Sequence, residues 1–138
     1  GDLFMITYGD GVADIDIDKL VNFHKSKGVM ATVTGVHPVS RWGLINIDEN
    51  NIITRLDQKP MLYDYVNGGF MVFNKEFLDI LKEGDMIEDA ISKLIPQKQV
   101  ALYKHESFWY GMDTYKDFVF LNKLWDEDPK WKIWEKKN

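Results

Sequence analysis

The chain has 138 residues, a net charge of −5 and no cysteine. Its length fits one domain, and the absence of cysteine excludes disulfides, thiolate zinc sites and cysteine nucleophiles, which permits a cytoplasmic location. The negative charge argues against nucleic-acid binding. No apolar run approaches the roughly 20 residues that cross a bilayer, so we expect neither nucleic acid nor a membrane as a partner.

The first predicted element is a buried strand that begins at Leu3 and delivers Asp10 to its carboxyl end. Open α/β sheets bind their ligands at that edge. Gly9 and Gly11 flank the aspartate and leave room for a bulky group, such as a metal ion carrying phosphate. The same Gly-Asp-Gly pattern is also ordinary turn chemistry. The stretch alone therefore leaves a turn and a metal site equally open.

A strand–helix–strand unit follows from the next residues. A helix is expected from an N-cap at Asp16 to a stop at Gly28. β-Branched residues then predict a strand over residues 29–36. Together with the first strand, this pattern predicts a crossover between parallel strands. A buried strand so close to residue 1 also suggests that further sequence lies upstream.

The middle of the chain predicts a β-hairpin. Two short apolar runs, residues 44–48 and 52–56, flank the turn at residues 49–51, where asparagine tolerates left-handed backbone. Lys59 follows the hairpin and is expected to be extended because Pro60 comes after it. A lysine in such a loop is usually only solvated, so by itself it favours no function.

Residues 65–73 predict a strand that contains the adjacent glycines Gly68 and Gly69. Adjacent glycines weaken a strand, so they indicate either a bulge or a ligand close to the backbone, and we prefer the ligand. Two helices are expected next, one capped by Asn74 and one opened by a capping box over residues 85–88. Both are expected to be structural.

A strand over residues 100–105 and a helix capped by Thr114 complete the predicted elements. Asp113 falls between them, where a carboxylate can compensate the helix dipole or help to hold a cation. The residue by itself favours the structural role. The polar tail over residues 126–138 carries tryptophans, and we expect it to dock against the body of the protein or a partner subunit.

Taken together, these segments resemble the sugar-phosphate nucleotidylyltransferases. The motifs that carry the resemblance are Thr7-Tyr8-Gly9-Asp10-Gly11-Val12-Ala13-Asp14, Arg41-Trp42-Gly43, Lys59-Pro60, Val66-Asn67-Gly68-Gly69-Phe70, Phe108-Trp109 and Met112-Asp113-Thr114. Within the family, the cytidylyltransferases of glucose 1-phosphate are the most similar group. The resemblance implies a Rossmann-like α/β fold with a mixed, mostly parallel sheet and a β-hairpin insertion. It also implies that CTP and glucose 1-phosphate react to give CDP-glucose and pyrophosphate, for surface-polysaccharide sugars.

The resemblance also assigns roles to individual residues. Asp10 and Asp113 match the aspartates that hold Mg²⁺, and Lys59 matches the lysine that neutralises the sugar phosphate, so these three are the expected catalytic residues. The expected substrate-binding residues are Gly9, Arg41, Asn67, Gly68, Gly69 and Trp109.

Two substitutions and one absence depart from the family pattern. Gln58 stands where glutamate is usual, which removes a charge, and Trp42 stands where phenylalanine is common. The glycine-rich nucleotide loop with its catalytic arginine, the second lysine and the base-reading residues are absent.

We therefore expect residues 1–138 to be a single domain, the carboxyl-terminal sugar-phosphate and metal-binding part of an amino-terminally truncated enzyme. Alone it should be nearly inactive, and association as a homo-oligomer would cover its exposed strand edges. A non-catalytic sugar-phosphate-binding or assembly module is the alternative. A glycosyltransferase that uses nucleotide sugars ranks below both, because it leaves the lysine-proline and double-glycine motifs unexplained.

Overall fold

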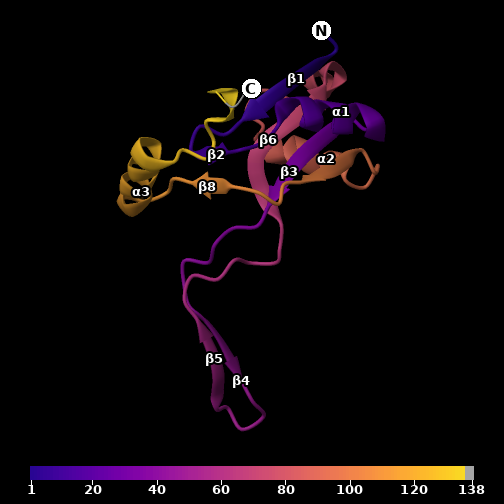
Figure 1. Cartoon of the computed structure of the whole chain (residues 1–138). Helices are drawn as coiled ribbons and strands as arrows, with labels where there is room; N and C mark the ends of the chain where they lie inside the picture. The colour runs from indigo at the N-terminus through magenta and orange to yellow at the C-terminus, as the bar shows by residue number, and fades with distance from the viewer. Residues whose placement is uncertain (136–138) are drawn as a thin grey trace.

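A computed structural model describes residues 1–135 of the chain. The strands of its central sheet are β1 (Leu3–Thr7), β3 (Ala31–Val36), β6 (Val66–Asn74) and β7 (Val100–Lys104). They lie in the order β1-β6-β3-β7, and Figure 1 shows β1, β6 and β3 together in the body of the molecule. β6 pairs antiparallel with β1 and β3, and β3 and β7 are parallel, so three of the four strands run in one direction. The expected mixed sheet is confirmed, and three of its strands share one direction, but only β3 and β7 form a parallel pair because β6 separates the two strands of the expected crossover.

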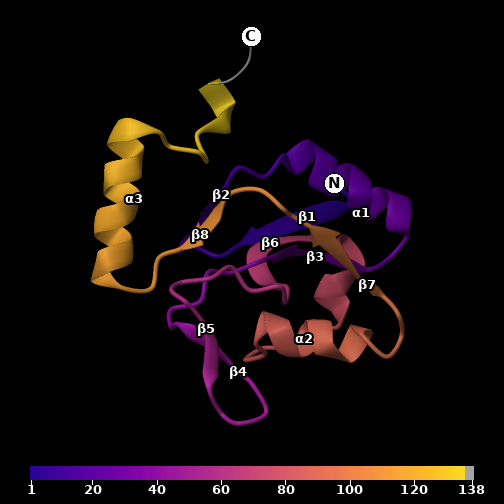
Figure 2. The same cartoon turned by 60° about the horizontal axis from the view of Figure 1, so that its bottom comes forward.

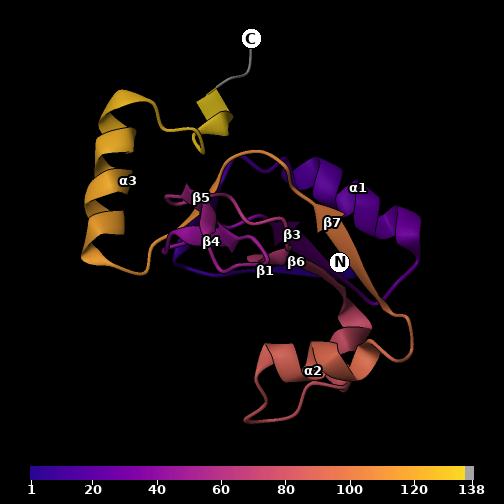
Figure 3. The same ribbon diagram turned by 90° about the horizontal axis from the view of Figure 1, so that it is seen from below.

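The helices α1 (Ile17–Lys27) and α2 (Ile87–Leu94) cover the two faces of this sheet. The chain also forms the helix α3 (Tyr115–Glu127) and the 3-10 helices η1 (Lys75–Asp79) and η2 (Ile133–Glu135). Figure 3 shows α1 and α2 on opposite sides of the sheet. Leu20 of α1 and Val72 belong to one buried cluster, and Leu94 of α2 and Phe73 belong to the other. Successive residues of β6 thus serve opposite faces, and each such buried side chain contributes about 1.5–3 kcal/mol.

Local signals set the limits of α1 as expected. The Asp16 carboxylate accepts a hydrogen bond from the Lys19 amide at 3.1 Å, which satisfies one free donor of the first turn. Gly28 ends the helix in left-handed conformation with φ 63°.

The two caps predicted after β6 are wrong. The side chain of Asn74 does not cap a helix, because its amide group is hydrogen-bonded to the ring of His24 and to the carbonyl of Val29. Only the short helix η1 follows it. Asp85 does not open a capping box either. Its carboxylate accepts from the Lys82 amide at 3.0 Å, and α2 begins after Met86 without a side-chain cap.

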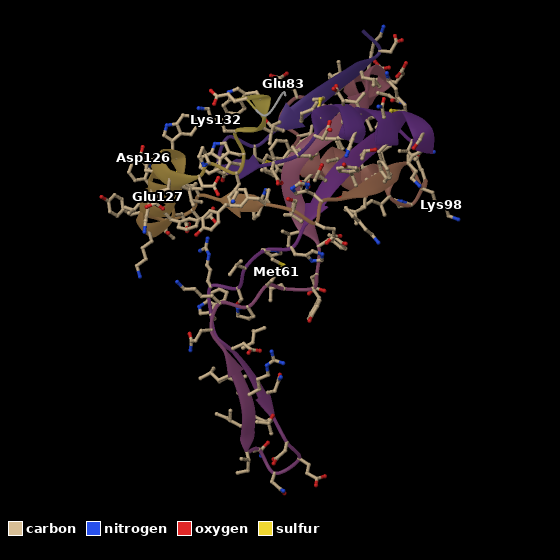
Figure 4. All side chains as sticks on the ribbon, in the orientation of Figure 1. Met61, Glu83, Lys98, Asp126, Glu127 and Lys132 are labelled. Carbon is tan, nitrogen blue, oxygen red and sulfur yellow. The ribbon has the colours of Figure 1, made fainter. Side chains whose placement is uncertain are left out.

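The expected hairpin is confirmed as a separate ribbon of β4 (Leu44–Ile47) and β5 (Ile53–Asp57). Asn51 in its turn has φ 63°, the left-handed conformation predicted there. The ribbon extends far from the rest of the chain (Figure 1), and Figure 4 places Met61 where the ribbon joins the body. Residues 37–65, which form the ribbon and the two segments that carry it, are called the arm below.

A third, two-stranded sheet pairs β2 (Gly11–Ala13) with β8 (Trp109–Gly111). Figure 2 shows that the chain runs from β8 to α3, which lies apart from the central sheet. The predicted docking of the tail is confirmed for Trp131, whose ring lies 5.9 Å from that of Phe108. Trp134 is exposed, and residues 136–138 of the predicted tail lie outside the described part. Within residues 1–135, every helix is too short or too polar to cross a membrane.

Candidate active site

The β2–β8 sheet brings two of the expected catalytic residues together. Gly11 pairs with Gly111, and one step further the Met112 amide donates to the Asp10 carbonyl at 2.7 Å. Asp10 directly precedes β2, and Asp113 follows Met112, so both aspartates lie at the same end of this sheet. Both residues are exposed. More than 100 residues of sequence separate the two aspartates, and the pairing of β2 with β8 brings them to the same end of one sheet.

The donor set at this end fits Mg²⁺. Mg²⁺ prefers oxygen ligands and is usually held by one or two carboxylates together with substrate phosphates. Within residues 1–135, His, Cys, Asp and Glu form no group of three that could hold a metal ion without such phosphates. Asp113 already carries a positive partner, because its carboxylate binds the Arg41 guanidinium and both side chains are about half exposed. Asp10 and Asp113 could therefore hold the ion only if Arg41 left Asp113, or if Asp113 bound Arg41 and the ion at the same time.

The arm places Arg41 and Lys59 on facing segments. The amide of Ser40 donates to the carbonyl of Pro60 at 2.8 Å, next to an antiparallel bridge between Val39 and Met61. Arg41 follows Ser40 and Lys59 precedes Pro60, so two cations lie across from each other on the arm. Through Arg41 this part of the arm reaches the aspartate pair.

The predicted extended conformation of Lys59 is wrong. Its φ is 49°, in the left-handed region that side chains other than glycine rarely adopt, and the proline after it disfavours helical backbone. Such strain costs of the order of 1–3 kcal/mol and persists where the surrounding structure imposes it, often at functional sites. The strained backbone at Lys59 therefore favours a specific functional role for this residue over that of a merely solvated lysine.

The double glycine of β6 forms a bulge. The pairing of β3 with β6 shifts register between Val33 and Gly35, which leaves extra residues on β6. Gly69 has φ 83°, and a side-chain carbon there would lie 2.6 Å from the Tyr8 ring. A side-chain carbon at Gly68 would lie 2.8 Å from Val36. The protein's own packing thus explains both glycines, and the ligand preferred from sequence is not needed to explain them.

The bulge residues and Trp109 hold one another through hydrogen bonds. The Asn67 side chain accepts from the Gly69 amide at 2.8 Å, and the Trp109 indole donates to the Gly68 carbonyl at 2.9 Å. The Gly69 carbonyl accepts from the Tyr8 amide at 2.9 Å. These contacts fix the strand that leads to Asp10, and a substrate role for this group stays a prediction.

Gly9 differs from the glycines of the bulge. Among the described residues other than its chain neighbours Tyr8 and Asp10, nothing lies within 4 Å of the position that a side-chain carbon would take at Gly9, and its backbone is not left-handed. Neither packing nor conformation therefore requires glycine here. The open space beside Asp10 fits the predicted close approach of a ligand to this backbone.

Sequence reasoning missed a polar cluster around the hydroxyl of Tyr8. The hydroxyl of Tyr8 donates to the Glu88 carboxylate and accepts from the Asn67 amide at 3.1 Å. Burial, followed by the hydrogen bond to Glu88, raises the pKa of Tyr8 to about 12, and the same bond lowers the pKa of Glu88. Tyr8 stood in the aspartate motif, but Glu88 had been interpreted only as part of a capping box. No sequence signal joined residues from β1, β6 and α2.

Asp14, the last residue of the aspartate motif, fastens the far end of the β2–β8 sheet. Its carboxylate accepts from the Ser107 hydroxyl and lies 3.0 Å from Nε2 of the buried His105. Its amide donates to the Phe108 carbonyl at 3.2 Å. These contacts connect the loop before β8 to the loop after β2. Asp14 therefore contributes to the site by holding the β2–β8 sheet together.

Comparisons with known proteins place these features in one family. A family model described as nucleotidyl transferase matches residues 1–127. A Bacillus subtilis protein described as a probable glucose-1-phosphate cytidylyltransferase is 37% identical over 135 residues, 95% of this chain and 53% of that protein. The glucose-1-phosphate cytidylyltransferase of Salmonella typhimurium is 34% identical over 135 residues, 96% of this chain and 52% of that protein. The mannose-1-phosphate guanyltransferase of Saccharomyces cerevisiae is 28% identical over 140 residues, which cover 92% of this chain and 39% of that protein.

Solved structures support the fold. HddC from Yersinia pseudotuberculosis aligns with a TM-score of 0.60 at 13% identity, over 91% of this chain and 56% of that one. A glucose-1-phosphate thymidylyltransferase candidate from Bacillus anthracis aligns with a TM-score of 0.65 at 19% identity, over 91% and 55%. The chain spans about half the length of the cytidylyltransferases that it matches.

Proposed function

The chain belongs to the nucleotidyl transferase family, and from this membership we propose that it forms the sugar-phosphate and metal-binding part of a glucose-1-phosphate cytidylyltransferase. The whole protein would convert CTP and glucose 1-phosphate to CDP-glucose and pyrophosphate. The observation that carries the proposal is the hydrogen bond from Met112 to Asp10, which puts both aspartates at one end of a sheet that Arg41 also reaches. Identity of 34–37% to cytidylyltransferases of glucose 1-phosphate supports the choice of substrates.

The reaction needs positioning and charge neutralisation more than covalent chemistry. An oxygen of the sugar phosphate attacks the α-phosphorus of CTP, the α–β anhydride bond breaks, and pyrophosphate leaves. Lys59 would neutralise the sugar phosphate, and Arg41 would supply a second cation from the same arm. Gly9 would let the substrates lie against the backbone. Asp10 and Asp113 would hold Mg²⁺, which when bound neutralises phosphate charge.

The first test is calorimetric titration of residues 1–138 with glucose 1-phosphate in the presence of Mg²⁺. Lys59→Ala should weaken binding about 10- to 100-fold, because a hydrogen-bonded charge is worth about 1.5–3 kcal/mol. Lys98→Ala is a matched control, since Lys98 is also an exposed loop lysine with positive φ, at 55°. Figure 4 shows Lys98 far from the arm, so this variant should bind like the native chain. Absence of glucose 1-phosphate binding by the native chain would refute the proposed function.

A second measurement is pyrophosphate release from CTP and glucose 1-phosphate. We expect almost none from residues 1–138 alone, and robust turnover would show that these residues suffice for catalysis. Sugar-phosphate binding without turnover by a protein of the relatives' length would favour the non-catalytic binding module instead.

We also propose that the protein is cytoplasmic, where CTP is found, and that it associates with a second copy of itself. The support for association is the ribbon. Opposite residues of an antiparallel pair share a face, so Ile45 and Leu56, and Ile47 and Ile53, present one apolar face, with each side chain more than half exposed. This face carries no charge and is therefore complementary to itself.

A further inference from the structure

Three polar side chains from separate elements meet at the hydroxyl of Tyr8, the residue before Gly9. Tyr8 follows β1, Asn67 lies in β6, and Glu88 lies in the first turn of α2. The Tyr8 hydroxyl donates to Glu88 and accepts from Asn67 at 3.1 Å. One residue connects this cluster to the open backbone, because Tyr8 directly precedes Gly9.

The cluster is held rigidly. The Tyr8 amide donates to the Gly69 carbonyl at 2.9 Å, and the Tyr8 ring packs against the left-handed backbone of Gly69. Asn67 is fixed in turn by the Gly69 amide at 2.8 Å. Side chains that are already ordered lose little entropy when they bind a ligand, which favours selective recognition.

Glu88 keeps acceptor capacity. A carboxylate offers about four acceptor sites, and the Tyr8 hydroxyl occupies one. The bond from Tyr8 lowers the pKa of Glu88, so the carboxylate is ionised near neutral pH and only accepts. Glu88 is exposed, and its carboxylate would receive hydroxyl donors from a ligand lying over Gly9.

A purely structural reading explains only part of this arrangement. An acidic residue in the first turn of α2 stabilises the helix dipole wherever its carboxylate points. That effect requires neither the phenol partner nor the open side of a glycine that packing and conformation leave unexplained. Sugar hydroxyls are donors that a carboxylate held by the residue next to this open backbone can recognise.

We propose that Glu88, oriented by Tyr8, is a specificity-determining residue that accepts a hydrogen bond from one hydroxyl of the sugar phosphate. The proposal rests on the proposed function, because it assumes that a sugar phosphate binds over Gly9. It adds a residue of α2 to the site that the aspartate pair and the arm define.

The test is calorimetric titration of the 138-residue chain with glucose 1-phosphate and its monodeoxy analogues, in the presence of Mg²⁺. The native chain should bind the analogue that lacks the recognised hydroxyl about 10- to 100-fold more weakly. Glu88→Gln keeps the shape but removes the charge, so this discrimination should fall about tenfold. Asp89→Asn, an exposed neighbour in the same turn of α2, should behave like the native chain. Tyr8→Phe should reduce discrimination without abolishing it, because Glu88 then loses its fixed orientation.

Each outcome separates recognition from other roles. Equal weakening of all analogues by Glu88→Gln would show a merely structural effect and overturn the proposal. Full discrimination in Glu88→Gln alongside tight glucose 1-phosphate binding would overturn it alone and leave the proposed function standing. Failure of the native chain to bind glucose 1-phosphate would overturn both.

Discussion

Gly9 and Gly69 are glycines for different physical reasons. At Gly69 the backbone is left-handed, with φ 83°, and the Tyr8 ring occupies the place of a side chain. At Gly9 both constraints are absent among the described residues. A glycine that neither backbone conformation nor packing explains is consistent with a ligand that approaches it. Gly69, in contrast, is explained by the fold, because it positions Tyr8.

These two glycines make a matched pair of alanine variants. Gly69→Ala should lower the free energy of unfolding by at least about 1–2 kcal/mol, the cost of left-handed backbone alone. Gly9→Ala should change it by less than about 0.5 kcal/mol yet weaken glucose 1-phosphate binding. Urea denaturation and calorimetry measure the two effects. If Gly9→Ala binds like the native chain, Gly9 has no role in the site.

At the scale of elements, the features predicted correctly from the sequence are those that depend on residues close together in the chain. Asp16, Asn51 and Thr114 act within a few positions of themselves, and all three do what the local pattern predicted. Asn74 and Asp85 carried equally good local signals and did not cap, because other partners took their side chains. Capping chemistry can be read from sequence only where no other partner competes for the side chain.

The candidate site depends on long-range pairing, which local patterns do not encode. That Asp10 meets Asp113 follows from the register of β2 against β8, and composition or spacing gave no indication of it. Only the family resemblance joined the two residues. Glu88 was missed for the same reason, because its partner Tyr8 lies 80 residues away.

The start of α3 supports Asp113 and gives a pH-dependent prediction. The Asp117 carboxylate accepts from the amides of Asp113 and Thr114, each at 3.0 Å, and from the Tyr110 hydroxyl. These bonds, that of Asp113 first, lower the pKa of Asp117 from 3.8 to about 2. A lowered pKa means that the stabilisation is complete above pH 4 and is lost as the pH falls from about 4 to 2.

Asp117→Asn should therefore destabilise the chain at pH 7 by about 1 kcal/mol, the usual value of a helix cap. It should also lose the part of the pH dependence between pH 4 and 2 that the native carboxylate provides. Urea unfolding followed by circular dichroism, without Mg²⁺, measures both effects. Asp126→Asn at the other end of α3 removes a carboxylate from the negative end of the helix dipole and should not destabilise. Equal losses in the two variants would contradict this account of the cap.

At the scale of the whole molecule, the arm is anchored at its base and free at its tip. Glu106, just after β7, accepts from the Tyr65 hydroxyl and lies 3.0 Å from Nε2 of His37. The rings of His37 and Tyr65 lie 4.2 Å apart. Both segments of the arm are thus fixed to the end of the central sheet. Beyond that point the ribbon projects into solvent (Figure 1), with every residue of β4 exposed.

An isolated two-stranded hairpin is marginally stable in water, and this one places four of its apolar side chains, those of Ile45, Ile47, Ile53 and Leu56, on a single face. Association with a second copy would bury that face, so Ile47→Thr with Ile53→Thr should weaken self-association by at least about tenfold for each substitution, which is 1.4 kcal/mol. Threonine keeps the strand preference of a β-branched residue. Asn46→Thr changes the opposite face and should leave association intact. Sedimentation over a range of concentrations measures the effect, and a native chain that stays monomeric, or equal loss in Asn46→Thr, would show that the apolar face is not the interface.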